Sequence, residues 1–175
     1  MLKHFLLVLL VSVSLFAGNF EKGLEAAQKG DYQTALKLWK IEAKQGNSAA
    51  EYNLGIMYEF GKGVKQDHKE AVKWYKLAAK QGNSGAQRNL GNMYQEGNGV
   101  NLDYKEAAKW YKLAANQGDS EAQTNLGYLY VTGKGVPKDK VKAYKWWLEA
   151  AKQGESKAQN NLDFLCKESP WACKQ

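Results

Sequence analysis

A step of 36 residues runs through most of the chain and constrains its fold more than any other feature of the sequence. The pair Gln45-Gly46 recurs as Gln81-Gly82, Gln117-Gly118 and Gln153-Gly154. Other positions keep the same step: Asn53, Asn89, Asn125 and Asn161; Tyr58, Tyr94 and Tyr130; Gly61, Gly97 and Gly133; Trp74, Trp110 and Trp146. A fixed period of roughly 20–50 residues is the signature of tandem structural repeats. The chain is therefore expected to form an array of similar units.

Each unit is expected to contain two helices joined by a glycine-rich turn. Residues 84–96 carry apolar side chains at the spacing of one helical face: Ala86, Leu90, Met93 and Tyr94. Asn83 precedes this segment as a capping residue, and Gly97 ends it because glycine adopts the left-handed conformation at low cost. A second helix is expected from about Asp103 to Gln117, with these residues facing inward: Ala107, Trp110, Tyr111, Ala114 and Ala115.

A single hairpin of this kind cannot cover its own apolar face, so each must stack on its neighbours. The sequence therefore predicts an all-α fold: a solenoid of antiparallel helix hairpins, wound into a right-handed superhelix and without strands. The expected parts are a signal peptide 1–18, an opening helix pair 19–45, full repeats 46–81, 82–117 and 118–153, and a closing helix with a capped tail 154–175.

Two stretches of each full repeat resemble Sel1-like repeats, which are relatives of the tetratricopeptide repeats. In the second copy they read Ala86-Gln87-Arg88-Asn89-Leu90-Gly91 and Ala107-Ala108-Lys109-Trp110-Tyr111. Exported Sel1-repeat proteins, such as the Helicobacter cysteine-rich family, are similar in this respect. The opening pair, with its turn Gly30-Asp31-Tyr32, is more similar to a tetratricopeptide unit. The resemblance implies an adaptor scaffold and leaves the partner unspecified.

The first residues have the layout of a bacterial Sec signal peptide. Lys3 precedes an apolar run from Phe5 to Phe16, and the small residues Ala17 and Gly18 follow it. A transmembrane anchor is the weaker interpretation, because a span needs roughly 20 apolar residues. The sequence therefore predicts a periplasmic or secreted protein whose only contact with a membrane is through the cleaved leader.

Cys166 and Cys173 lie seven residues apart near the C-terminus. An even number of cysteines in an exported chain favours a disulfide. We expect this bridge to cap the closing helix and to hold Trp171 over its last apolar face. A redox or metal-binding pair is the alternative, which the absence of a C-x-x-C spacing and of a nearby histidine disfavours.

The chain has 25 basic and 18 acidic residues, and Arg88 is its only arginine. Lysines recur on the second helices and mark an outer, solvated face. Nucleic acid is not an expected partner because arginine, the preferred base reader, is nearly absent. A weak attraction to anionic surfaces is expected instead. The glutamates are expected at outward positions as well: Glu51, Glu59, Glu70, Glu96, Glu106 and Glu121.

Catalytic patterns are scarce in this sequence. His68 is the only histidine beyond the leader, and elements such as Gly61-Lys62-Gly63 follow helices and are therefore turns. No cofactor, metal site or catalytic residue is predicted.

A binding groove is expected where the first helix of each hairpin lines the concave side. The asparagine column offers donors and acceptors; the resemblance implies that it holds an extended peptide, and bonding to the neighbouring repeat's backbone is the alternative. Arg88 is predicted to pair with a ligand carboxylate, and Tyr52, Phe60 and Tyr128 to act as aromatic anchors. The candidate groove residues are Tyr52, Asn53, Ile56, Phe60, Arg88, Asn89, Asn92, Thr124, Asn125 and Tyr128.

Two functions remain as hypotheses. The first is an exported, non-catalytic adaptor that binds a protein or peptide in this groove. The second, implied by resemblance alone, is a β-lactamase-like or penicillin-binding hydrolase of the cysteine-rich Sel1-repeat type. That type places a cysteine pair in each repeat, where this chain has residues such as Ala79 and Ala86, and no Ser-x-x-Lys nucleophile motif is present.

Overall fold

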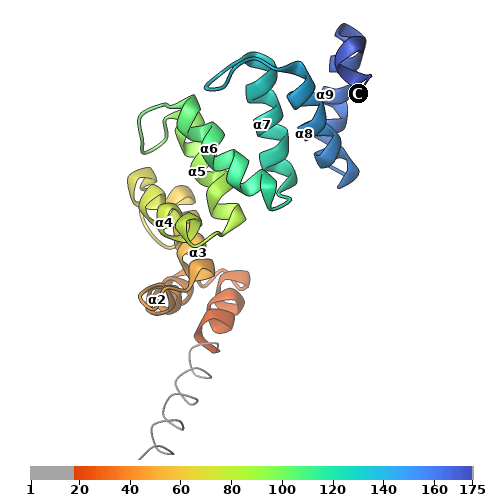
Figure 1. Ribbon diagram of the computed structural model, residues 1–175. Coiled ribbons are helices and arrows are strands. Elements are labelled where there is room, and N and C mark those ends of the chain that lie inside the picture. Colours follow the sequence, from red (N-terminus) through yellow and green to blue (C-terminus); the bar gives the residue numbers. More distant parts are fainter. Residues whose placement is uncertain (1–17, 175) are drawn as a thin grey trace, which may run out of the picture. The chain divides into compact units, whose positions relative to one another are not determined.

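The computed structural model describes residues 18–174, so the predicted signal peptide, apart from Gly18, lies outside the described residues. The described part is helical throughout and contains no strand, as the sequence predicts (Figure 1). It forms two compact units, residues 18–81 and 82–174. None of its helices is both long enough and apolar enough to cross a membrane.

The first unit contains a helix over residues 18–28, followed by three longer helices: α2 (Tyr32–Ala43), α3 (Ser48–Phe60) and α4 (His68–Lys80). The second unit contains α5 (Ser84–Glu96), α6 (Tyr104–Asn116), α7 (Ser120–Thr132), α8 (Lys140–Lys152), α9 (Ser156–Glu168) and the short 3-10 helix η1 (Pro170–Cys173). From α2 to α4 and from α5 to α9, each helix packs on the next one in the chain.

The helix ends follow the predicted capping chemistry. Asn83 accepts a hydrogen bond from the backbone N–H of Ala86 at the start of α5, and Asp103 accepts from the N–H of Glu106 at the start of α6. Gly97 ends α5 with φ 74°, in the left-handed region where glycine carries no Cβ penalty. The observed α5 coincides with the predicted 84–96 segment, because its caps are local and the sequence alone specifies them.

A close contact between a glycine and an aromatic ring recurs inside every hairpin. A Cβ added at Gly91 would lie 2.5 Å from Cε1 of Tyr111. The same arrangement joins these other pairs: Gly23 and Trp39, Gly55 and Tyr75, Gly127 and Trp147. The glycine therefore permits the ring of the second helix to lie directly on the first helix.

A second recurring contact joins a glutamine after the second helix of each full hairpin to a polar side chain of the first helix. The Nε2 of Gln117 donates to Oε1 of Gln87 at 2.7 Å, and the Nε2 of Gln153 donates to Oε1 of Gln123 at 2.9 Å. In the first unit, Gln81 donates to Glu51 at 2.7 Å. This contact gives the repeated glutamine of the Gln-Gly pair a structural role.

The prediction that the glutamates all face outward is wrong for Glu51, which is 4% exposed. Burial raises the pKa of Glu51 above its ordinary value, and the hydrogen bond from Gln81 opposes this shift. Glu59 is also only half-buried, and it accepts a hydrogen bond from the hydroxyl of Tyr75. Both carboxylates face the second helix of their own hairpin, which covers them.

The tail confirms the predicted disulfide, since Cys166 and Cys173 are bonded. The role predicted for Trp171 is wrong: its side chain is 60% exposed. Ala172 is buried instead, and Cys173 packs on the apolar cluster of α8 and α9. Pro170 starts a tight 3-10 turn that directs the small residue, not the indole, toward the core.

Candidate functional site

A polar pocket of about 410 Å³ lies in the second unit and is the candidate functional site. Its lining comes from α5, α7 and α9, which are the first helix of each hairpin in this unit and the closing helix. The lining residues are Gln95, Thr124, Asn125, Tyr128, Lys157, Asn160 and Asn161. Amide and hydroxyl groups dominate this set, so the pocket offers donors and acceptors rather than an apolar surface.

A short chain of hydrogen bonds holds the amide of Asn125 in place. Its Nδ2 donates to Oδ1 of Asn92 at 3.2 Å, and the hydroxyl of Tyr111 donates to the same oxygen at 2.6 Å. Burial raises the pKa of Tyr111 far above its ordinary value, with a further contribution from the charge of Glu96. The hydroxyl therefore stays protonated and remains a donor at physiological pH, which fixes Asn92 as the acceptor.

Gln95 contributes an unsatisfied group to the α5 side of the pocket. Its Oε1 is buried and accepts no hydrogen bond from the described residues. A buried acceptor without a donor costs about 1–3 kcal/mol.

Arg88 does not line this pocket, because its guanidinium is occupied within the chain. Its Nη1 lies 3.0 Å from Oδ2 of Asp119, and its Nε lies 3.5 Å from Oε2 of Glu121. The Arg88 and Asp119 side chains are only 21% and 9% exposed. Asp119 also caps α7 by accepting from the N–H of Ala122. Arg88 thus ties α5 to the start of α7, and its predicted role toward a ligand carboxylate stays a prediction.

The other predicted groove residues occupy several places. Asn53 and Ile56 line a more apolar pocket of about 260 Å³ in the first unit, beside Tyr32, Trp39 and Lys62. Tyr52 packs on the ring of Tyr75, with 6.0 Å between the ring centroids. Phe60 is 60% exposed, and Asn89 is half-buried.

Thr124, Asn125 and Tyr128 are the predicted residues that the structure brings together in the polar pocket. The ring of Tyr128 also contacts a cation, since Nζ of Lys134 lies 5.6 Å from its centroid. The ring of Tyr104 lies 5.0 Å from the same nitrogen. Hydrogen bonding to Tyr128 and Tyr104 raises the pKa of Lys134.

Sequence reasoning missed Gln95, Lys157 and Asn160 as pocket residues. Asn160 precedes Asn161 of the asparagine column, so the column itself points to this part of α9. Gln95 and Lys157 belong to no repeated column that the sequence marks as functional. Only the stacking of α5, α7 and α9 shows that they face one another.

The helix pairs and their repeated contacts define a tandem helical repeat protein of the scaffold class. The Sel1 repeat family matches four consecutive segments, residues 17–47, 48–83, 84–119 and 120–155. The chain therefore belongs to the Sel1 repeat family. A comparison with curated protein sequences gives no significant match.

Three solved structures are similar to this chain. A protective antigen present in uropathogenic Escherichia coli strains, displaying an SLR fold, is 36% identical with a TM-score of 0.81, over 86% of this chain and 33% of its own. A Sel1 repeat protein from Oxalobacter formigenes is 35% identical with a TM-score of 0.79, and the match covers 82% of this chain and 59% of that protein. Cysteine rich protein B of Helicobacter pylori is 25% identical with a TM-score of 0.58, and the match covers 74% of this chain and 96% of that protein.

The chain thus spans about a third of the E. coli antigen and somewhat over half of the O. formigenes protein. These likenesses establish the Sel1 repeat scaffold, a fold that typically mediates protein–protein interaction.

Proposed function

We propose that this chain is a non-catalytic scaffold that binds an extended segment of a partner protein in the polar pocket of α5, α7 and α9. The observation that carries the proposal is the set of amide side chains from three successive first helices around one opening. An extended peptide presents an N–H and a C=O at each residue, and amides can bond both. The volume of about 410 Å³ is within the range of ligand pockets, roughly 300–1,000 Å³.

Two features of the pocket support a peptide main chain as the ligand. The Asn92 and Tyr111 bonds hold the Asn125 amide in position before a ligand arrives, so binding costs less side-chain entropy. Tyr128, 42% exposed, can cover one side chain of the segment. We expect micromolar affinity, about −8 kcal/mol, for a short peptide.

We further propose that the protein works in an oxidising compartment outside the cytoplasm. The bond between Cys166 and Cys173 is consistent with such a compartment. The leader predicted over residues 1–18 supports the same location. Fractionation of cells that produce the full chain tests this: a shortened chain outside the cytoplasm is expected, and a full-length cytoplasmic chain would contradict export.

Peptide selection followed by NMR tests whether a peptide binds in the polar pocket. Peptides selected on the immobilised chain from a random displayed library are titrated into ¹⁵N-labelled protein. The side-chain amide signals of Asn125 and Asn161 are expected to shift, because both line the pocket. The double variant Asn125→Ala and Asn161→Ala is expected to lose at least about tenfold in affinity, equivalent to about 1.4 kcal/mol.

Asn116→Ala is the matched control, since Asn116 is an exposed asparagine at the end of α6 and outside the pocket lining. Equal binding by the double variant and the control, with a circular dichroism spectrum unchanged in both, would refute the groove as the binding site.

A further inference from the structure

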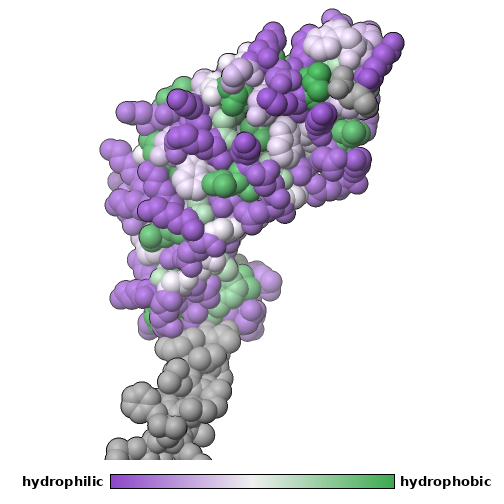
Figure 2. Space-filling model, in the orientation of Figure 1, coloured by the Kyte–Doolittle hydropathy of each residue, from purple (hydrophilic) through white to green (hydrophobic). Residues whose placement is uncertain are grey.

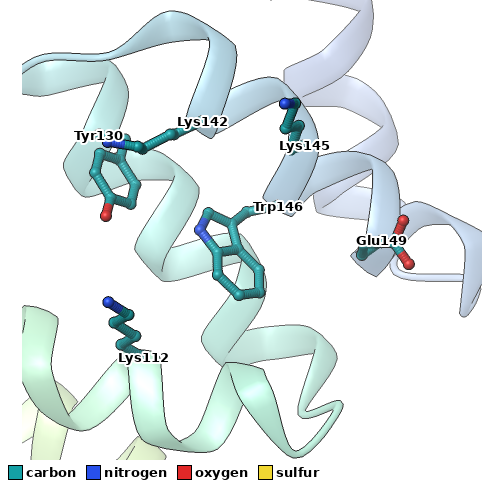
Figure 3. A pocket seen from close by; sticks show the side chains of 6 residues that line it. All are labelled: Lys112, Tyr130, Lys142, Lys145, Trp146 and Glu149. Carbon is teal, nitrogen blue, oxygen red and sulfur yellow. The ribbon is translucent and has the colours of Figure 1, made fainter.

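A second pocket of about 400 Å³ is lined by residues of α6, α7 and α8 in the second unit, none of which lines the proposed peptide-binding pocket. Figure 3 shows the indole of Trp146 projecting from α8 toward α6, with Tyr130 and Lys112 beside the same opening. The remaining lining comes from α8: Lys142, Lys145 and Glu149. Its walls are therefore two aromatic side chains, and its rim carries three lysines against one glutamate. We name it the Trp146 pocket.

The charge of this rim arises from a change in one repeated column. In α4, Lys73 pairs with Glu70 at 2.6 Å, and in α6, Lys109 pairs with Glu106 at 2.6 Å. The equivalent positions in α8 are Lys145 and Lys142, so a lysine replaces the glutamate that pairs with its neighbour. A repeating ion pair has become two adjacent cations beside a tryptophan.

The nearby acidic groups neutralise only part of this charge. The Nζ of Lys142 lies 3.3 Å from Oδ2 of Asp139 and 5.5 Å from the centroid of the Tyr130 ring. Glu149 already pairs with Lys152, with 2.7 Å between Oε1 and Nζ. Among the described residues, no ion pair involves Lys112 or Lys145. Two ammonium groups therefore remain available to a ligand at the rim of an apolar cavity.

We propose that the Trp146 pocket binds an acidic segment of a partner protein that inserts one aromatic side chain between Trp146 and Tyr130. The aromatic walls favour a ring, because offset or edge-to-face ring pairs add about 0.5–1.5 kcal/mol beyond area burial. The lysines attract carboxylates that flank this ring in the partner segment, which favours acidic partners and raises the association rate. The face of the molecule shown in Figure 2 is mainly hydrophilic, with scattered apolar side chains.

The probe for this site is the peptide acetyl-Glu-Asp-Phe-Glu-Asp-amide, titrated into the ¹⁵N-labelled full chain. The indole N–H signal of Trp146, assigned with the variant Trp146→Phe, is expected to shift with increasing peptide. The shift is expected to weaken as salt is added, because the contacts at the rim are charged. Replacing Phe by Ser in the peptide, or the four acids by lysines, is expected to abolish it.

The informative variant is Lys142→Glu, which restores the acidic residue of the other repeats and its ion pair with Lys145. We expect this variant to lower the affinity for the peptide by about tenfold or more. The fold is expected to stay intact, since a glutamate occupies this position in α4 and α6. Lys105→Glu makes the same charge change at an exposed residue of α6 outside the pocket lining and is expected to have a much smaller effect.

Unchanged binding by Lys142→Glu, or an equal shift with the lysine peptide, would overturn the proposal. Two other occupants have their own signatures. A Trp146 shift with phosphatidylglycerol vesicles but not with the peptide would assign the pocket to anionic lipid. Self-association that Trp146→Ala removes, without any peptide effect, would assign it to a second copy of the chain. Either result would replace the proposed partner segment.

Discussion

The hairpins α5–α6 and α7–α8 are nearly identical inside and different outside. In both, a glycine of the first helix lies against a ring of the second, Gly91 on Tyr111 and Gly127 on Trp147. Both also carry a hydrogen-bonded glutamine pair between their two helices, in which the glutamine of the first helix is buried. At other positions the two hairpins differ: Arg88 of the first corresponds to the buried Thr124 of the second, and Glu106 corresponds to the exposed Lys142. The repeated columns thus hold the hairpin together, and we propose that the columns that vary determine what each hairpin binds.

The largest effect is expected from the repeated interior. Gly91→Ala places a Cβ about 2.5 Å from ring carbons of Tyr111, so the ring must move. We expect unfolding in urea to show a loss of about 3 kcal/mol, the upper part of the range for overpacking. Gly118→Ala is the control: its φ is +90°, but nothing lies within 4 Å of the added Cβ. The control is expected to cost only about 1 kcal/mol, from backbone strain alone. Equal losses would show that the ring contact is not the cause.

The next effect concerns the tail of the second unit, where the described residues after α9 form η1. The double variant Cys166→Ser and Cys173→Ser removes the bond that fixes η1 on α8 and α9. A loss of about 2 kcal/mol is expected for a loop of this size. Thermal unfolding of the oxidised and reduced wild-type chain provides the same comparison without mutation. A midpoint that does not move on reduction would show that the tail does not stabilise the array.

A smaller effect is expected at a position where the two hairpins differ. Arg88→Ala removes a half-buried ion pair that joins α5 to the cap of α7. We expect a loss of about 1.5 kcal/mol in urea unfolding, as for a hydrogen bond to a charged group. Glu121→Ala, which removes only the exposed partner at 3.5 Å, is expected to cost less than about 0.5 kcal/mol. If Arg88→Ala left stability unchanged but weakened peptide binding, Arg88 would act on the ligand as the sequence predicts.

The smallest effect on stability is expected at Glu51, the buried carboxyl group of the first unit, whose equivalent in α5 is Gln87. The pKa of Glu51 is raised, so its protonated form favours the folded state. The stability it contributes is present below its ordinary pKa and is lost as the pH rises through the raised value. Glu51→Gln, which creates the pairing seen at Gln87, is expected to stabilise the chain at pH 7 by less than about 1 kcal/mol. The gain should shrink toward pH 4; a constant gain would contradict the assigned cause.

The hydrolase alternative has a separate test in a chromogenic cephalosporin assay on the purified chain. We expect no turnover above background, because the sequence supplies no nucleophile motif. Turnover that Tyr128→Phe abolished, with folding unchanged, would instead place catalysis in the polar pocket.

The fold could be predicted because the period, the caps and the glycine stops are local properties of the sequence. Residues such as Asn83 and Gly97 specify helix ends whatever packs around them. The predicted exposure of a side chain was wrong where its burial depends on residues far away in the sequence or on the path of a turn. Glu51 is covered by α4, and its hydrogen-bond partner Gln81, directly after that helix, lies thirty residues later in the sequence. Trp171 is exposed because the turn after Pro170 sends Ala172 inward.

The candidate site was predictable only in part, for a related reason. Asn125 and Tyr128 share a face of α7, which helical spacing alone indicates. The approach of Gln95 and Lys157 depends on how α5 and α9 stack against α7, which the repeat pattern does not specify.

The most direct test of the central claim is a set of intermolecular nuclear Overhauser effects between a selected peptide and the labelled chain. We expect contacts from backbone protons of the peptide to the side-chain amides of Asn125, Asn161 and Gln95. Contacts confined to the repeated interior columns or to the lysines of α4, with none to these amides, would contradict it.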